Sequence, residues 1–295
     1  MAYLYGWGGL TGGGCGREEL VAALAGGESA VRPHPALGIV CAAVDPDFHL
    51  ADYTPTTYHY LDPAAAFTIA AVRMALDDAG ITVTPETALR SGMTLGTRWG
   101  CTDAMAKYQA KLLDADPKFA PPFLFTNAFP NAPAAVAAIE FGLKGYNTVF
   151  AGCTDAGVLA VRAAVRAVDC GAADLVAAVG VDALSPVVAD AWTGAVPPGE
   201  GAVCLLVGTV PRPGAVRMTP LAGGDADGAA AVFAVTGGVV RDGRGGVVPL
   251  GDMMAAGLPL ALALAADKVR LEGLRKARVA YRDDRTAWTC LLEAV

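Results

Sequence analysis

The amino-acid sequence predicts an α/β fold in which a largely buried sheet is covered by helices. Short apolar runs alternate with longer stretches that have the apolar spacing of helices. The short runs are apolar almost throughout rather than at every second residue, as in strands that are covered on both faces. At 295 residues, 54% of them hydrophobic and 17% charged, the chain is long enough to bury a large core.

Five of the apolar runs are predicted as strands, because they are short and are bounded by turn-forming residues. A glycine cluster, residues 8–16, follows the first run and is predicted as a tight turn into a short helix that ends at Gly26 and Gly27. It does not match a dinucleotide-binding loop, because Thr11 stands where that motif needs glycine. The five runs are residues 2–7, 91–97, 148–151, 175–181 and 203–207.

Helices are predicted between these strands from capping residues and apolar stripes. Asp62 stands at an N-cap position, with Pro63 in the first turn and Gly80 at the C-terminal stop. Residues 31–60 hold all three histidines and several prolines, and we expect them to form a long surface excursion. The predicted helices are residues 63–79, 103–113, 134–143 and 155–168, the last two ended by Gly145 and Gly171.

The rhythm of strands and helices changes after about residue 210. Residues 211–217 form a turn-rich joint, and fewer apolar segments follow it than precede it. We therefore predict two parts, residues 1–210 and residues 211–295, of which the second is abbreviated. The later apolar segments are 229–234 and 253–266, followed by two short strands at 278–281 and 288–292.

Composition and charge exclude several classes of protein. A net charge of −7 argues against nucleic-acid binding, which needs a basic surface. We expect no membrane span, because no run of about 18 apolar residues occurs. The first residues lack a basic region ahead of an apolar one, so a cytoplasmic location is expected. Seven scattered cysteines without a C-x-x-C pair predict reduced thiols, and no metal site is expected.

Short motifs along the chain carry a resemblance to one enzyme family. They are Tyr5-Gly6-Trp7-Gly8, Asp78-Ala79-Gly80-Ile81, Leu95-Gly96-Thr97, Phe141-Gly142-Leu143-Lys144-Gly145, Gly180-Val181-Asp182-Ala183-Leu184-Ser185 and Gly199-Glu200-Gly201-Ala202. In order and spacing they resemble the β-ketoacyl synthases, the condensing enzymes of fatty-acid and polyketide assembly. The resemblance implies a thiolase-like fold of αβαβα layers, with an N-terminal-like half at 1–210 and a truncated C-terminal-like half at 211–295.

The catalytic residues that this resemblance implies are missing. The family's nucleophilic Cys lies three residues before a glycine, and counting back from Gly157 gives Thr154. Cys153 is one residue too early, so we expect its side chain to point away from the pocket. The family's two catalytic histidines lie in the second half, whereas here the segment 250–257 places Asp252 at one of those positions. A carboxylate there opposes the negative charge of an enolate.

A catalytically silent relative in the family, the chain-length factor, has the same missing residues. It pairs with an active ketosynthase and shapes the tunnel for the growing chain in type II polyketide, polyene or fatty-acid elongation. The resemblance therefore implies a heterodimer whose partner supplies the Cys and the histidines. An acyl carrier protein would deliver the substrate on phosphopantetheine, so no cofactor is expected on this chain itself.

The resemblance also implies where the partner and the acyl chain lie. One short strand is expected to pair with its equivalent in the partner across a pseudo-two-fold axis; its residues are Thr148, Val149, Phe150 and Ala151. Large side chains at a pocket floor set its depth, although ordinary helix packing is an alternative for each of them. The gate candidates are Met105, Tyr108, Gln109, Leu112 and Phe129.

Two other functions stay open on the sequence. The first is an active 3-oxoacyl-[acyl-carrier-protein] synthase or acyltransferase that uses Cys153 or Thr154 as its nucleophile. The second is a free-standing acyl-binding or scaffold protein that never pairs with a ketosynthase.

Overall fold

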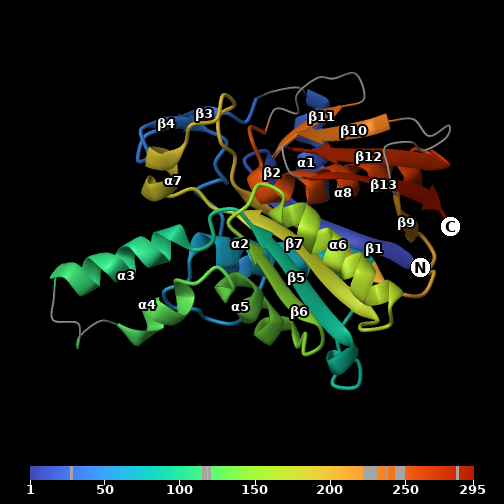
Figure 1. Ribbon diagram of the computed structural model, residues 1–295, viewed down its shortest axis with the longest axis horizontal. Coiled ribbons are helices and arrows are strands. Elements are labelled where there is room, and N and C mark those ends of the chain that lie inside the picture. The colour runs from blue at the N-terminus through green and yellow to red at the C-terminus, as the bar shows by residue number, and fades with distance from the viewer. Residues whose placement is uncertain are drawn as a thin grey trace.

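A mixed 11-stranded sheet runs through the protein, and helices cover both faces of its first half (Figure 1). The computed structural model describes residues 1–295 except 27–28, 115–117, 119–120, 222–230, 237, 243–249 and 284–285. Within this described part, no helix is both long and apolar enough to cross a lipid bilayer. Gly27 and residues 229–230, which the sequence analysis includes, lie outside it.

The strands alternate with helices through the first 208 residues. The helices are α1 Arg17–Gly26, α2 Pro63–Ala79, α3 Thr102–Asp114, α4 Pro122–Asn127, α5 Ala132–Phe141, α6 Ala156–Asp169, α7 Pro186–Ala191 and α8 Gly257–Arg270, with 3-10 turns η1 Leu50–Asp52, η2 Ala88–Arg90 and η4 Met254–Ala256. The strands are β1 Ala2–Thr11, β2 Gly14–Cys15, β3 Arg32–His34, β4 Ile39–Cys41, β5 Ser91–Thr97, β6 Asn147–Ala151, β7 Leu175–Asp182, β8 Gly201–Gly208, β9 Val216–Leu221, β10 Ala231–Thr236, β11 Val239–Asp242, β12 Lys276–Arg282 and β13 Ala287–Ala294.

One strand order occurs twice in the sheet. The first series lies in the order β6-β5-β7-β8-β1, and the second in the order β11-β10-β12-β13-β9. If the strands of each series are numbered along the chain, both orders read 3-2-4-5-1. The two series meet where β1 and β9 pair antiparallel. The fold is therefore a duplication of one α/β topology, which the predicted strands alone did not reveal.

The second series is built from the shorter stretch of chain, residues 216–294. Nine residues of sequence separate β9 from β10, whereas the 17-residue helix α2 lies between β1 and β5 of the first series. Helix α8 packs against β10, β12 and β13 and also contacts α6. Because α6 packs on β5 and β7, these two helices lie between the two parts of the sheet. The predicted division at residues 210 and 211 stays a prediction.

The buried side chains form two large clusters on opposite faces of the first series. Alternate residues of β7 and β8 point to opposite sides, so that Val176 and Leu205 join one cluster while Ala177 and Leu206 join the other. Helices α6 and α8 fill the first cluster, and α2 and α5 fill the second. Burial on both sides explains why these strands are apolar throughout.

Strand β1 is longer than predicted, because four residues assigned to the glycine turn, residues 8–11, belong to the strand. A side chain at Gly8 would place its Cβ 2.4 Å from Cβ of Met74 and 2.5 Å from the backbone nitrogen of Ala75 in α2. The glycine is needed for this close approach of strand and helix rather than for a turn. The strand therefore continues to Thr11, and the tight turn occupies residues 12–13.

Helix α5 begins and ends two residues earlier than predicted. Gly142, with a φ of 67°, takes the left-handed conformation that ends it, so Gly145 is not its stop. The sequence analysis also missed the short helices α4 and α7 and strands β9 and β11, which are brief or adjoin segments without a clear period.

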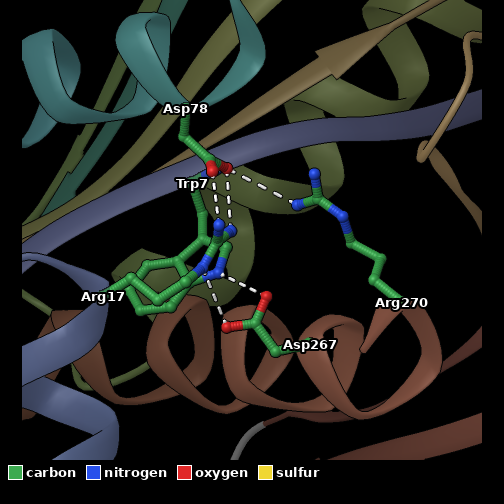
Figure 2. A network of polar contacts seen from close by, with 5 residues as sticks. All are labelled: Trp7, Arg17, Asp78, Asp267 and Arg270. Carbon is green, nitrogen blue, oxygen red and sulfur yellow. Dashed lines mark hydrogen bonds and ion pairs between the residues drawn. The ribbon is translucent and has the colours of Figure 1, made fainter. Parts of the chain in front are cut away.

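A partly buried ion-pair network ties the two halves together (Figure 2). Arg17 of α1 contacts both Asp78 at the end of α2 and Asp267 of α8, and its guanidinium lies 5.2 Å from the ring centroid of Trp7. The indole nitrogen of Trp7 donates to Asp267 over 3.1 Å, and Arg270 lies 3.5 Å from Asp78. Four elements of the chain thus meet at one set of charges.

Replacing Arg17 with methionine is expected to destabilise the fold. Methionine keeps an apolar stem but leaves Asp267 without its cation, so we expect a loss of about 3 kcal/mol in the free energy of unfolding. The measurement is chemical denaturation followed by circular dichroism. The matched control is Arg90→Met, because Arg90 pairs with Asp174 at the surface and its loss costs much less. Equal losses in the two variants would show that the network is not stabilising.

Candidate functional site

Thr154, which stands at the expected nucleophile position, is held by a hydrogen bond in the turn before α6. Its hydroxyl lies 3.0 Å from Oδ2 of Asp283, which follows β12. The hydroxyl of Tyr281 donates to the same oxygen over 2.7 Å. Burial and this bond raise the pKa of Tyr281, so that it stays a neutral donor. The carboxylate of Asp283 therefore organises this corner of the site.

Thr286, which precedes β13, contacts the start of α6. Thr286 donates through its hydroxyl to Asp155 over 2.5 Å and through its backbone nitrogen to Asp283 over 2.6 Å. Residues from the second half of the chain thus contact both residues that precede α6. None of these contacts was predicted from the sequence, because the partners lie more than 120 residues apart.

Cys153 is the residue immediately before Thr154, and it is half-buried. Its expected orientation away from the pocket stays a prediction. Among the described residues, no group of three His, Cys, Asp or Glu side chains is placed to hold a metal ion.

Asp182 is the central buried carboxylate of the region. At the end of β7 it accepts hydrogen bonds from the hydroxyl of Thr97 over 2.9 Å and from the backbone nitrogens of Trp99 and Ala255 over 2.8 and 3.0 Å. The backbone nitrogen of Arg98 adds another donor at 2.9 Å. Complete burial raises the pKa of Asp182 to about 6, although these donors favour its charged form.

The 3-10 turn η4 sits directly against two glycines. A Cβ at Gly157 or at Gly180 would lie 1.9 or 2.2 Å from the backbone oxygen of Ala255. Gly157, which sets the register of the expected nucleophile, is therefore required for contact between α6 and η4. Met254, in the middle of this contact, has a positive φ of 49°, a backbone conformation that costs energy for a residue with a side chain.

Asp252 stands where the resemblance places a catalytic histidine. Its Oδ1 accepts a hydrogen bond from the backbone nitrogen of Met254 over 2.9 Å, and the backbone nitrogen of Asp252 donates to Pro197. Burial raises the pKa of Asp252, and the nearby Arg98 lowers it. The carboxylate of Asp252 thus holds the backbone at Met254 and offers only hydrogen-bond acceptors. An enolate oxygen needs donors.

The gate candidates lie on α3 and at the end of α4, which extend together from the sheet (Figure 1). The ring of Tyr108 lies 5.4 Å from that of Phe125, and Phe125 lies 4.9 Å from Phe129. Phe125, which belongs to the segment 123–129 that the resemblance places along the acyl tunnel, thus lies in contact with two of the candidates. Met105 packs beside the buried Cys101, Leu112 is partly exposed, and Gln109 is exposed. Their role as a gate stays a prediction.

Strand β6 forms one edge of the sheet. In the described part of the chain it pairs with β5 alone, in parallel register. Val149 packs against the core behind the sheet, while Thr148 and Phe150 are partly exposed and Ala151 is exposed. The backbone of an edge strand offers hydrogen-bonding groups to a further strand.

The duplicated 3-2-4-5-1 order and the site between the halves define an α/β protein of the thiolase-like class. Residues 4–195 match the model of the β-ketoacyl synthase N-terminal domain, and the chain therefore belongs to the β-ketoacyl synthase family.

Relatives of known sequence and structure agree with this assignment. The chain is 31% identical over 192 residues to a polyketide β-ketoacyl synthase of Streptomyces virginiae, which covers 60% of this chain and 45% of the relative. It spans about half or less of the length of the curated relatives it matches.

Two solved structures share the fold along the whole chain. The ishigamide ketosynthase/chain length factor superposes with a TM-score of 0.77 at 21% identity, covering 100% of this chain and 99% of the other. A type II polyketide ketosynthase, solved with its acyl carrier protein, gives a TM-score of 0.74 at 16% identity with the same coverage. The predicted thiolase-like α/β fold is confirmed.

Glu200 supplies a test of the electrostatics next to this site. Its carboxylate accepts hydrogen bonds from the backbone nitrogens of Val44 over 3.0 Å and Leu184 over 2.7 Å, and burial raises its pKa to about 7. Between the ordinary pKa of a glutamate and about 7, Glu200 is protonated in the folded protein and ionised in the unfolded chain. The contribution of Glu200 to the free energy of unfolding therefore falls as the pH rises through this range.

We expect Glu200→Gln to remove this pH dependence. Relative to the variant, the free energy of unfolding of the wild type should fall by about 2 kcal/mol between about pH 5 and about pH 8. Urea denaturation of both proteins across this range gives the difference directly. Parallel stability curves for the two proteins would contradict the raised pKa.

Proposed function

We propose that the chain is a non-catalytic, chain-length-factor-like subunit that pairs with an active ketosynthase and shapes the acyl tunnel in type II polyketide, polyene or fatty-acid elongation. The carrying observation is the contact between Thr154 and Asp283 at the start of α6. Where the family places a thiolate, this chain has a hydroxyl bound to a carboxylate.

The surroundings of Thr154 do not favour its use as a nucleophile. A hydroxyl needs a general base to remove its proton and an electropositive site to stabilise the resulting charge. Asp283 could accept the proton, but it also receives bonds from Tyr281 and from the backbone nitrogen of Thr286. Its negative charge, together with that of Asp155, opposes a second negative charge on the adjoining oxygen.

Asp252, which stands where the resemblance places a catalytic histidine, supports the same proposal. A decarboxylating centre needs hydrogen-bond donors aimed at the developing enolate oxygen. Asp252 instead accepts a bond from the backbone of Met254, and its partly buried charge is of the wrong sign. A histidine, by contrast, can donate. Both halves of the family's chemistry are therefore altered in one chain.

Exposed apolar groups on α3 and α4, on the side of the molecule to which these two helices extend (Figure 1), support a partner protein. Leu113 at the end of α3 is 86% exposed, and Phe123 of α4 is 68% exposed. Apolar side chains gathered on one side of the molecule indicate an interaction surface. We propose that the partner ketosynthase covers this side and that its own edge strand pairs with Thr148, Val149, Phe150 and Ala151.

The solved structures with the same fold support an acyl carrier protein as a second partner. One neighbour of the same fold was solved as a ketosynthase with its acyl carrier protein, and another is a ketosynthase/chain length factor. We propose that a carrier protein brings phosphopantetheine-bound acyl groups to the heterodimer. Tyr108, Met105 and the other gate candidates would then limit the depth of the tunnel.

Replacing Leu113 with aspartate is expected to weaken the heterodimer. The substitution places a charge on the exposed apolar side, so co-purification with a co-expressed ketosynthase should drop at least tenfold. The matched control is Leu271→Asp, because Leu271 is 70% exposed at the end of α8 and belongs to neither α3 nor α4. If the wild type is monomeric and never co-purifies with the ketosynthase, it is a free-standing binding or scaffold protein instead.

An acylation assay separates the silent subunit from an active acyltransferase. The half-buried thiol of Cys153 is the observation that favours the second function. We expect the purified chain, incubated with acyl-acyl carrier protein, to gain no acyl mass on Cys153 or Thr154 in intact-protein and peptide mass spectra. A mass gain that is lost in Cys153→Ala would establish the active enzyme.

A further inference from the structure

Arg98 carries a guanidinium that the fold holds rigidly but supplies with no acceptor. Its Cζ lies 5.4 Å from the ring centroid of Trp99 and 5.2 Å from that of Trp192. Such contacts with aromatic faces orient a guanidinium while leaving its N–H groups at the edge. Within the described residues, no carboxylate forms an ion pair with Arg98 and no oxygen accepts a hydrogen bond from its side chain.

The backbone of Arg98 is held in place by hydrogen bonds to the buried Asp182. The nitrogen of Arg98 donates to both oxygens of Asp182, over 2.9 and 3.2 Å, and the nitrogen of Trp99 donates to the same carboxylate. Trp192 is fixed independently, because its indole nitrogen donates to the backbone oxygen of Val196 over 3.1 Å. The two rings and the cation that contacts both of them are therefore organised before any ligand arrives.

A second donor in the same cluster also lacks an acceptor. The indole Nε1 of Trp99 is buried, and no hydrogen-bond partner for it occurs in the described structure. A buried N–H without an acceptor costs free energy, which a ligand oxygen or a bound water recovers. Arg98 itself is partly exposed to solvent.

We propose that Arg98, Trp99 and Trp192 form a binding site for a carboxylate or phosphate group. The planar guanidinium matches the paired oxygens of either group, and charge-assisted hydrogen bonds of this kind are the strong ones. The indole faces add apolar contact for the part of the ligand next to the charged group. This site stands on contacts independent of the proposed pairing with a ketosynthase.

The neighbouring Asp252 sets the expected strength of binding. Arg98 is near enough to Asp252 to lower the pKa of that carboxyl group. An anion bound at Arg98 would therefore also be close to the negative charge of Asp252 and be repelled by it. The side chain of Asp252 also holds the backbone nitrogen of Met254 through Oδ1. An asparagine keeps an oxygen for that bond and removes the charge. The site therefore provides two substitutions with opposite expected effects.

Titration of the full-length chain with succinate and with inorganic phosphate tests the site, using tryptophan fluorescence and calorimetry at constant ionic strength. We expect saturable binding of at least one probe. Arg98→Gln should weaken it at least tenfold, and Arg98→Lys should weaken it several-fold, because lysine keeps the charge without the planar fork. Asp252→Asn should strengthen binding several-fold.

The two probes distinguish the sources of the anion. Saturation by succinate alone identifies a carboxylate ligand, and saturation by phosphate alone identifies a phosphate group such as one on a carrier arm. The proposal is wrong if neither probe saturates the wild type, or if Arg98→Gln and Asp252→Asn both bind as the wild type does. Because no ketosynthase is present in the titration, its failure leaves the heterodimer untouched.

Discussion

The whole site depends on the buried carboxylate of Asp182. It lies at the end of a central strand and gathers donors from two separate segments, the turn after β5 and the 3-10 turn before α8. The second segment comes from the other half of the duplication, so this one side chain joins the two halves. Burial disfavours its charge, and the converging donors offset that cost. The glycines at 157 and 180 then become necessary, because they let Ala255 come this close.

The fold was largely predictable, and the failures have physical causes. Strands β5, β7 and β8 are buried on both faces and read as short apolar runs. Helix α2 has an aspartate N-cap, a proline in its first turn and a left-handed glycine at its end. The turn expected at Gly8 was wrong because glycine there serves helix packing, which depends on α2 and not on local sequence. The repeated strand order is likewise a property of pairing between distant segments.

Sequence reasoning located the two positions at which the expected catalytic residues are replaced, but not the contacts that the replacing residues make. Counting from Gly157 locates Thr154, and the glycines at 251 and 257 locate Asp252, since both positions are fixed by motifs along the chain. The partners of these residues could not be predicted. Asp283 meets Thr154 across 129 positions of sequence, and Arg98 meets Trp192 only because a loop returns to the same end of the sheet. A signal for the second cluster existed, because Arg98 and Trp99 follow a buried strand directly.

The contact of Thr154 with Asp283 also bears on the proposed catalytic silence of this chain. A helix N-terminus stabilises a thiolate through its positive potential. Here Asp155 and Asp283 place two carboxylates at the N-terminus of α6, and they cancel that potential. A cysteine substituted for Thr154 would therefore have its pKa raised by like charge. On the proposed function, restoring the sulfur alone would therefore not restore a nucleophile, because Asp283 would still lie beside it and receive hydrogen bonds from Tyr281 and Thr286.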